Sequence, residues 1–191
     1  QVLVDGVDIR DITQHDLRQQ IGYIPQKGVL FSGTIASNLQ YGDSDATETE
    51  MMDVLETAQA TAFIAEKANG LDEEIAQGGT NVSGGQKQRL SIARALVKKP
   101  KIYIFDDSFS ALDFKTDKAL RAALKEKVGD STLIIVAQRI NTIMDAEQIL
   151  VLEDGKLAGK GTHDELMETC EVYKEIALSQ LSEEELERGR K

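Results

Sequence analysis

The chain has 191 residues, which is enough for one domain with a substantial buried core. Its net charge of −11 argues against nucleic acid as a partner, because phosphate backbones bind basic surfaces. The single cysteine excludes an intrachain disulfide framework, and no apolar run reaches the length of a membrane-spanning helix. The chain begins within an apolar stretch and without an initiator methionine, so we expect it to be a piece of a longer protein.

The first third of the chain predicts a hairpin, a strand and a helical stretch. Residues 2–9 alternate apolar and polar types around an Asp-Gly turn, and residues 21–25 form a short apolar run. Residues 47–68 predict helix, because Thr47 and Glu50 have capping-box spacing. The residues expected on its packed face are Met51, Val54, Leu55, Ala58 and Ala62.

A layer of strands and helices follows Pro100. The apolar runs 102–105 and 132–137 predict strands that are buried on both faces, as in a parallel sheet. A helix predicted over residues 116–128 lies between them, with Gly129 at its end. Together these segments predict a strand–helix–strand unit.

The last part of the chain predicts a hairpin and a terminal helix. The strands at 148–152 and 156–158 flank a turn, and Thr162 with Glu165 forms a second capping-box pattern. The residues expected on the packed side of the terminal helix are Val172, Ile176 and Leu181. Residues 182–191 are polar, and we expect them to be frayed.

The stretch VSGGQKQRL predicts a phosphate-binding tip. Ser83 occupies the N-cap position of a helix predicted over residues 86–97, and Gly84 and Gly85 follow it. Glycines let a ligand approach the backbone, and the helix behind them directs free N–H groups and a partial positive charge at that point. The alternative is a flexible loop before a helix.

The stretch IYIFDDSFSALD ends a predicted buried strand with two aspartates, Asp106 and Asp107. A carboxylate at a strand end is the usual means of holding Mg²⁺ beside the phosphates of a nucleotide. Mg²⁺ takes few protein ligands, so one carboxylate can suffice. An ordinary strand-end acid is the alternative. The order of the glycine tip, one helix, a proline and then this strand favours the nucleotide site.

These residues resemble the nucleotide-binding domain of ABC transporters. VSGGQKQRLSIARAL resembles the family's signature motif, and IYIFDDSFSALD resembles its Walker B strand and D-loop. IGYIPQKGVLFSGTIASNL resembles the Q-loop segment, with Gln26 as its glutamine. TLIIVAQRINTI resembles the switch-histidine segment, and ILVLEDGKLAGKGTHDEL the closing strands and helix. The resemblance covers residues 2–178, and its Q-loop and closing segments favour the exporter branch.

The resemblance implies an α/β fold, namely a RecA-like P-loop NTPase core with a parallel sheet flanked by helices and with an inserted all-helical subdomain. Residues 1–191 would be a partial nucleotide-binding domain. Its parts would be residues 1–42 (strand and Q-loop part of the core), 43–99 (helical subdomain with the signature motif), 100–165 (core) and 166–191 (C-terminal helix and tail).

The chain departs from the family pattern in its phosphate loop. No G-x-x-x-x-G-K-[ST] sequence occurs in the 191 residues, and GKGT at 159–162 lacks the spacing. The family's Walker A strand and loop would lie upstream of Val2, so we expect truncation. We therefore expect that the chain alone does not hydrolyse ATP.

Two further departures concern the residues that would face the γ-phosphate. Asp107 stands where the family usually has a catalytic glutamate, and its side chain is shorter by one methylene, about 1.5 Å. Misplacing a catalytic group by about 1 Å can cost on the order of 10²-fold in rate. Gln138 stands at the switch-histidine position and cannot take up a proton. The alternative for Asp107 is a cap on the following turn.

The resemblance implies ATP and Mg²⁺ as cofactors. Mg²⁺ would be held by Asp106 and Gln26, and the degenerate catalytic positions would be Asp107 and Gln138. The residues implied in binding ATP, in this site or in a partner's, are Gln26, Ser83, Gly84, Gly85, Gln86, Asp106 and Asp113.

The resulting expectation is an ATP-binding subunit of an ABC exporter at the cytoplasmic face of the cell membrane. It would act with transmembrane domains and with a second nucleotide-binding domain. In the family two such domains meet head to tail, so the intact signature motif would complete the partner's site in a heterodimer, while this chain's own site is degenerate. The alternatives are a homodimer with two weak sites, a soluble ABC-type ATPase such as a DNA-repair or translation factor, and a non-catalytic regulatory module.

Overall fold

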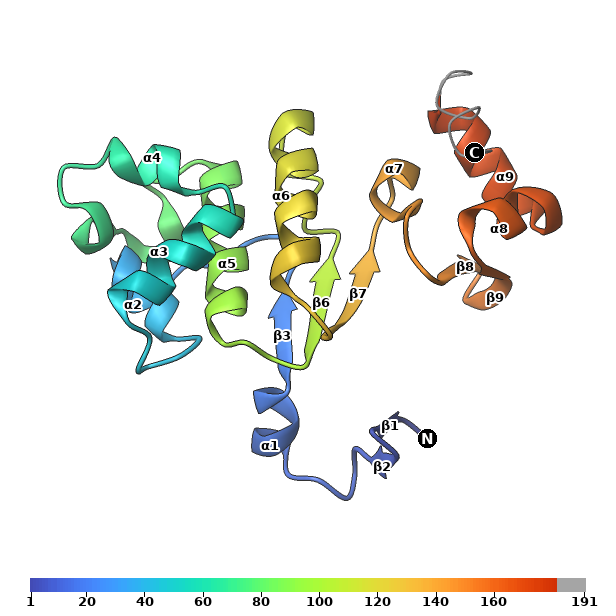
Figure 1. Cartoon of the computed structure of the whole chain (residues 1–191), viewed down its shortest axis with the longest axis horizontal. Coiled ribbons are helices and arrows are strands. Elements are labelled where there is room, and N and C mark those ends of the chain that lie inside the picture. The colour runs from blue at the N-terminus through green and yellow to red at the C-terminus, as the bar shows by residue number, and fades with distance from the viewer. Residues whose placement is uncertain (182–191) are drawn as a thin grey trace. The chain divides into compact units, whose positions relative to one another are not determined.

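The computed structural model describes residues 1–181 of the chain (Figure 1). It divides into two compact units, Gln1–Val136 and Ala137 onward, and each is described separately below. The polar tail predicted at 182–191 lies outside the described residues.

The first unit contains a three-stranded parallel sheet (Figure 1). Its strands are β3 (Ile21–Ile24), β6 (Ile102–Asp106) and β7 (Thr132–Val136), in the order β3-β6-β7. All three were predicted as strands, and the parallel arrangement of β6 and β7 is confirmed. Because the strands run in the same direction, their carboxyl ends meet at one edge, where Asp106 lies opposite Val136.

Burial of this sheet on both faces was predicted, and within the first unit that prediction is wrong. One face enters the core through Ile24 and Phe105, which are fully buried. On the other face Tyr23, Ile134 and Val136 are 54%, 46% and 52% exposed. An apolar run does not reveal whether both sides are covered, and the core helices of this unit pack on one side only.

Two helices occupy the stretch predicted as one helix over residues 47–68. They are α3 (Glu48–Thr57) and α4 (Thr61–Ala65). The capping box of Thr47 with Glu50 is confirmed. Gln59, with φ of 58°, interrupts the helix in the left-handed region. The helical phase restarts after this break, so Ala62 is exposed and the packed face prediction fails there.

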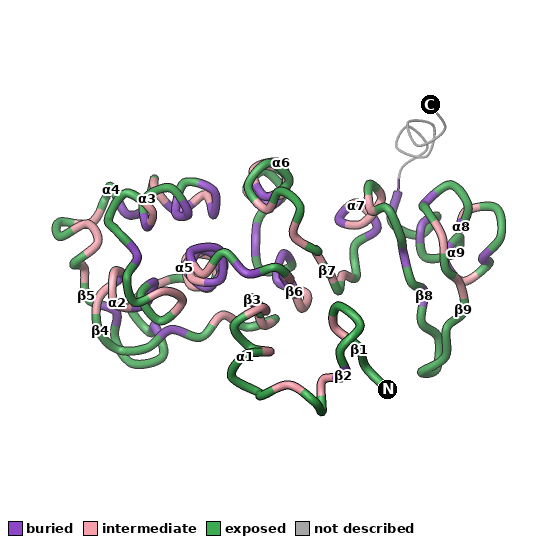
Figure 2. Tube along the Cα trace, turned by 60° about the horizontal axis from the view of Figure 1, so that its bottom comes forward, coloured by how far each residue is buried: buried purple, intermediate pink, exposed green. Residues whose placement is uncertain are grey.

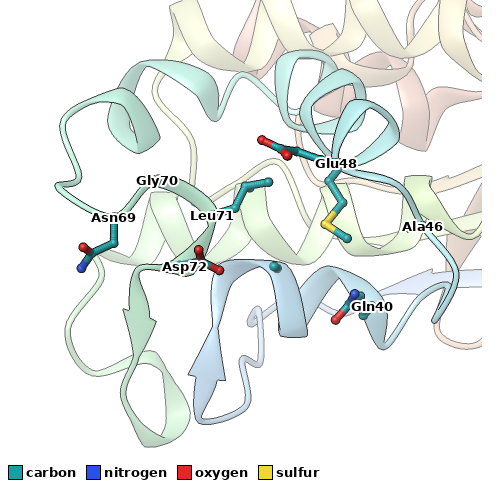
Figure 3. Close-up of a pocket in the computed structure, with 9 residues that line it drawn as sticks. Gln40, Ala46, Glu48, Asn69, Gly70, Leu71 and Asp72 are labelled. Carbon is teal, nitrogen blue, oxygen red and sulfur yellow. The ribbon is translucent and has the colours of Figure 1, made fainter.

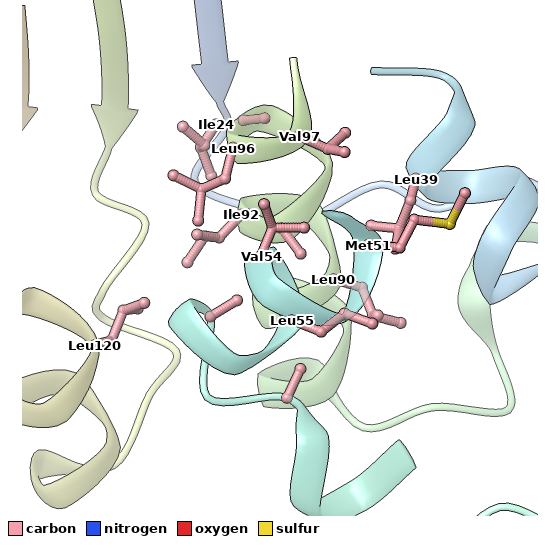
Figure 4. Close-up of a cluster of buried hydrophobic side chains, with 14 of the residues drawn as sticks. Ile24, Leu39, Met51, Val54, Leu55, Leu90, Ile92, Leu96, Val97 and Leu120 are labelled. Atoms are coloured by element: carbon pink, nitrogen blue, oxygen red, sulfur yellow. The ribbon is translucent and has the colours of Figure 1, made fainter. Parts of the chain in front are cut away.

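The core of the first unit is built around the helix α5 (Gly84–Val97), which begins at the predicted N-cap. Leu90 and Leu96 of α5 pack in one cluster with Val54 and Leu55 of α3 (Figure 4). Buried residues recur along α5 in Figure 2, and they include two polar ones, Gln88 and Ser91. The cluster extends to Leu39 in α2 and to Leu120 in α6.

The helix α6 (Phe114–Lys127) joins β6 to β7 and confirms the strand–helix–strand unit. Several short elements of the first unit had no counterpart in the sequence prediction. These are α1 (Gln14–Gln19), the paired strands β4 (Gly33–Thr34) and β5 (Glu74–Ile75), α2 (Ile35–Gln40), and the 3₁₀ turns η1 (Gly70–Asp72) and η2 (Gln77–Gly79). The predicted N-terminal hairpin is present as β1 (Leu3–Val4) and β2 (Val7–Asp8).

Residues 137–181, the described part of the second unit, form the predicted hairpin and three helices. The hairpin pairs β8 (Ile149–Glu153) with β9 (Lys156–Gly161) in antiparallel register. Asp154 and Gly155 both have positive φ, as a tight two-residue hairpin turn requires. The helices are α7 (Ile140–Ile143), α8 (His163–Thr169) and α9 (Glu171–Gln180).

The predicted terminal helix is in fact two helices that meet at Cys170. The capping box of Thr162 with Glu165 starts α8 as predicted. In α9 the buried residues are Tyr173 and Ala177, whereas Ile176 is 38% exposed, so its predicted packing is wrong. The buried residues Leu166, Cys170, Tyr173 and Ala177 follow one helical period, which leaves Ile176 beside the packed face. Burial raises the pKa of Tyr173 to about 12, and its hydroxyl lies 2.8 Å from Nδ1 of His163.

Helix α3 should lose stability in acid through Glu50. A hydrogen bond from Lys99, helped by one from the Thr47 N–H, lowers the pKa of Glu50 from 4.5 to about 2. A lowered folded-state pKa adds stability above the unfolded value, and this is lost as the pH falls. We expect Glu50→Gln to lower the melting temperature at neutral pH, and the difference from wild type to disappear between about pH 4.5 and 2.

Thermal unfolding across this pH range is the measurement. Glu48→Gln is the matched control, because Glu48 lies in the same helical turn but outside the capping box. A difference between Glu50→Gln and wild type that persists unchanged below pH 2 would contradict the assignment. Added salt should weaken the effect, because Glu50 is at the surface.

Candidate functional site

Two predicted site residues, Asp106 and Asp107, lie at the carboxyl edge of the parallel sheet. Asp106 ends β6 and is half-buried, and its Oδ2 accepts a hydrogen bond of 2.9 Å from the hydroxyl of Tyr23. That bond raises the pKa of Tyr23, because ionisation would remove the proton that the carboxylate accepts. Tyr23 was missed in the sequence. Its place on the same face as Asp106 depends on the register of β3 against β6, which neither strand's own pattern reveals.

Asp107 and Gln26 are brought together by the fold. Nε2 of Gln26 donates to Oδ2 of Asp107 at 2.9 Å. Asp107 has φ of 45°, and its N–H donates to the carbonyl oxygen of Val136, so the backbone leaves the sheet in a fixed, left-handed conformation. The backbone carbonyl oxygen of Asp107 accepts a hydrogen bond from Oγ of Ser110, which stabilises the turn after β6.

The glycine tip is the N-terminus of α5. The Oγ of Ser83 accepts from the Gln86 N–H at 3.2 Å, and Oε1 of Gln86 accepts from the Ser83 N–H at 2.9 Å. This capping box fixes the start of the helix. A Cβ added at Gly84 would meet no atom within 4 Å, and one at Gly85 only the Ala111 carbonyl oxygen at 3.6 Å.

Neither glycine of the tip is required by the fold. Gly84 and Gly85 do not have positive φ, and both lie in the first turn of a helix, where glycine costs up to about 1 kcal/mol relative to alanine. Internal packing therefore does not explain them. The open space above the backbone suits an external group that must approach the N–H groups closely.

Asp113 is the N-cap of α6. Its carboxylate accepts from the Thr116 hydroxyl at 2.7 Å and from the Thr116 N–H at 3.0 Å. These bonds lower the pKa of Asp113. The side chain is exposed, so one carboxylate combines a local capping role with access to solvent.

Gln138 belongs to the second unit. The residue is exposed, and its backbone carbonyl oxygen accepts a hydrogen bond of 2.8 Å from Nε2 of Gln180. All the other predicted site residues lie in the first unit.

Gln88 is the second residue that sequence reasoning missed. It is 1% exposed and hydrogen-bonds the backbone on both sides of Gln26. The sequence of α5 did not indicate this role for Gln88, because its hydrogen-bond partners are 60 and 63 positions away along the chain.

The donors at the sheet edge fit Mg²⁺ rather than a softer metal. They are carboxylate and amide oxygens, which Mg²⁺ prefers, and Mg²⁺ completes its coordination with water. Within residues 1–181 no group of three or more His, Cys, Asp or Glu side chains could hold a metal by itself. None of the helices in this part of the chain is both long and apolar enough to cross a membrane.

A separate pocket of about 550 Å³ lies in the helical part of the first unit (Figure 3). Residues of α2, α3 and η1 surround it, and Leu71 and Met51 supply apolar contact. It contains none of the predicted site residues, so it is distinct from the predicted site.

Comparison with known proteins agrees with this fold. The family model described as ABC transporter matches residues 1–110. An uncharacterized ABC transporter ATP-binding protein of Mycobacterium tuberculosis is 48% identical over 94% of this chain and 31% of its own length. An ATP-dependent lipid A-core flippase of Desulfotalea psychrophila is 40% identical over 87% of this chain and 29% of its own length. The structure of a bacterial Atm1-family ABC exporter with ATP bound has a TM-score of 0.90 and 39% identity, and the match covers 95% of this chain and 32% of that one.

The chain belongs to the ABC transporter family. Its fold is that of an exporter ATP-binding domain, with the predicted α/β core, parallel sheet and helices. It spans about a third of the length of the relatives it matches.

Proposed function

We propose that this chain is the ATP-binding domain of an exporter that works with transmembrane domains and with a second nucleotide-binding domain at the cytoplasmic face of the cell membrane. The observation that carries the proposal is the open Gly84-Gly85 tip at the start of α5. These glycines are unnecessary for internal packing, and such a tip suits the phosphates of an ATP bound by another domain.

Asp106 is the proposed ligand of the Mg²⁺ that accompanies ATP, with Gln26 beside it. When bound, Mg²⁺ neutralises charge on the phosphate oxygens. The Tyr23 hydroxyl orients the Asp106 carboxylate, and Gln26 links the phosphate end of the site to the segment that leads into the helical part. No G-x-x-x-x-G-K-[ST] loop occurs in these 191 residues, so the chain alone is proposed not to hydrolyse ATP.

We propose that this chain's own site is degenerate. The Asp107 carboxylate is short for the role of positioning water, and it accepts a hydrogen bond from Gln26. The carboxamide of Gln138 cannot carry a proton. The competent site would then be the partner's, completed by Ser83, Gly84, Gly85 and Gln86, and Asp113 would contact the partner across the interface. This asymmetry favours a heterodimer over a homodimer.

The test restores both catalytic side chains in the full transporter. We expect Asp107→Glu combined with Gln138→His to raise single-turnover hydrolysis at this chain's site by on the order of 10²-fold, because the longer carboxylate reaches the attacking water. The measurement is ATP hydrolysis resolved by site, with ATP consumed per transported molecule as a second readout.

Asp130→Glu combined with Gln148→His is the matched control, because it makes the same chemical changes at exposed positions. Unchanged turnover and stoichiometry in the restored variant would refute the degenerate site. A homodimer with two weak sites predicts instead that both sites accelerate equally.

A further inference from the structure

The segment that carries Gln26 is fixed to α5 by one buried side chain. Oε1 of Gln88 accepts from the Gly28 N–H at 2.8 Å, and Nε2 of Gln88 donates to the carbonyl oxygen of Pro25 at 3.1 Å. The two bonds lie on either side of Gln26. Gln88 is 1% exposed, so water does not compete for either end of its amide.

Gly28 brings this segment into direct contact with the helix. A Cβ added there would lie 2.7 Å from Oγ of Ser91, 3.0 Å from the Lys87 carbonyl oxygen and 3.1 Å from Oε1 of Gln88. Only a glycine allows so close an approach. The contact therefore leaves little freedom for the backbone beside Gln26.

A second contact lies further along α5. Nη2 of Arg94 donates to the Val29 carbonyl oxygen at 2.8 Å, and its guanidinium lies 5.4 Å from the centre of the Phe31 ring. Gln88, Ser91 and Arg94 are spaced by three residues, so they share one face of the helix. Residues 25–31 therefore lie along this face.

The same helix begins at the glycine tip. Gln88 follows Gly85 by three residues, which is less than one helical turn. A short path thus joins the tip to Gln88, Gln88 to Pro25 and Gly28, and Gln26 to Asp107. Each step is a covalent segment or a hydrogen bond between described residues.

We propose that Gln88 is a positioning residue that holds Gln26 at a fixed place relative to the glycine tip. The tip and the Gln26 segment then move as one body, so ATP at the partner's site and ATP at this chain's own site are coupled through α5. This inference rests on the proposed function. The competing explanation is that Gln88 only stabilises the fold.

The experiment is a double-mutant cycle in the full transporter. Gln88→Met keeps the size of the side chain and removes both hydrogen bonds. We expect it to lower kcat about tenfold and to leave the KM for ATP within about twofold, because Gln26 is displaced while the nucleotide is still bound. Gln26→Ala should lower kcat as well. If Gln88 acts through Gln26, the double variant should be no slower than the slower single variant.

Ile92→Val is the matched control for stability. Ile92 is fully buried on the same helix, and its side chain cannot hydrogen-bond the Gln26 segment. We expect it to reduce the melting temperature without changing kcat. Gln88→Asn is the second variant, in case Gln88→Met does not fold. It keeps a neutral amide but is shorter by one methylene and cannot span both backbone partners, so its kcat should lie between wild type and Gln88→Met.

The outcomes separate the inference from the proposed function. Multiplicative losses in the double variant, or a wild-type kcat in Gln88→Met, would overturn the positioning role while the proposed function stands. A transporter that does not hydrolyse ATP, or one that Gln26→Ala leaves unchanged, would refute the proposed role of Gln26 and this inference together.

Discussion

Replacing Gly84 by alanine should abolish most ATP turnover at the partner's site that α5 is proposed to complete, without loss of folding stability. The added methyl group meets no atom of the chain within 4 Å, and alanine is the better helix former by up to about 1 kcal/mol. It does, however, stand in the space through which a phosphate must reach the N–H groups of the first turn. A shift of the phosphate by about 1 Å would lower turnover on the order of 10²-fold.

Turnover of the full transporter and thermal unfolding are measured on the same variant. Ala122→Gly is the matched control, because it makes the reverse change at an exposed position of α6 and should lower stability while turnover is retained. Wild-type turnover in Gly84→Ala would show that nothing approaches the tip closely, and the proposed role of the signature motif would be wrong.

Replacing Gly28 by alanine should lower both folding stability and ATP turnover, whereas Gly84→Ala should lower turnover alone. The new Cβ would lie 2.7 Å from Oγ of Ser91, which is closer than van der Waals contact allows, and a backbone oxygen lies at 3.0 Å. Overpacking of this kind costs about 1–3 kcal/mol. Relief requires the segment to move away from α5, and Gln26 moves with it.

Chemical denaturation gives the stability change, and kcat gives the functional one. Gly28→Ala combined with Ser91→Ala removes the shortest contact and should recover part of both losses. If Gly28→Ala were as stable as wild type, the close approach of the segment to α5 would be wrong, and the positioning argument for Gln88 would lose its support.

Together the two glycines distinguish packing from ligand access. Both are small residues near the proposed nucleotide site. A Cβ added at Gly28 would meet atoms of α5, whereas one added at Gly84 would meet none beyond its own helix turn. The same substitution therefore reports on the fold at one position and on the proposed partner's nucleotide at the other.

Local sequence patterns determined the starts of three helices and the strands of the central sheet. The capping boxes at Thr47 and Thr162 and the N-cap at Ser83 were readable, because each involves residues a few positions apart. The apolar strands and the family membership also followed from contiguous stretches of sequence. In such cases the interacting groups lie close together along the chain, so one short pattern contains the whole interaction.

Only the tertiary structure decided how these pieces meet. The break at Gln59 and the exposed face of β7 depend on packing against other segments, which an apolar pattern does not encode. The bond from Gln26 to Asp107 spans 81 positions, and the bond from Gln88 to Pro25 spans 63. Contacts of this kind exist only after the chain has folded. The sequence therefore identified residues of the candidate site, and the fold determined which of them are in contact.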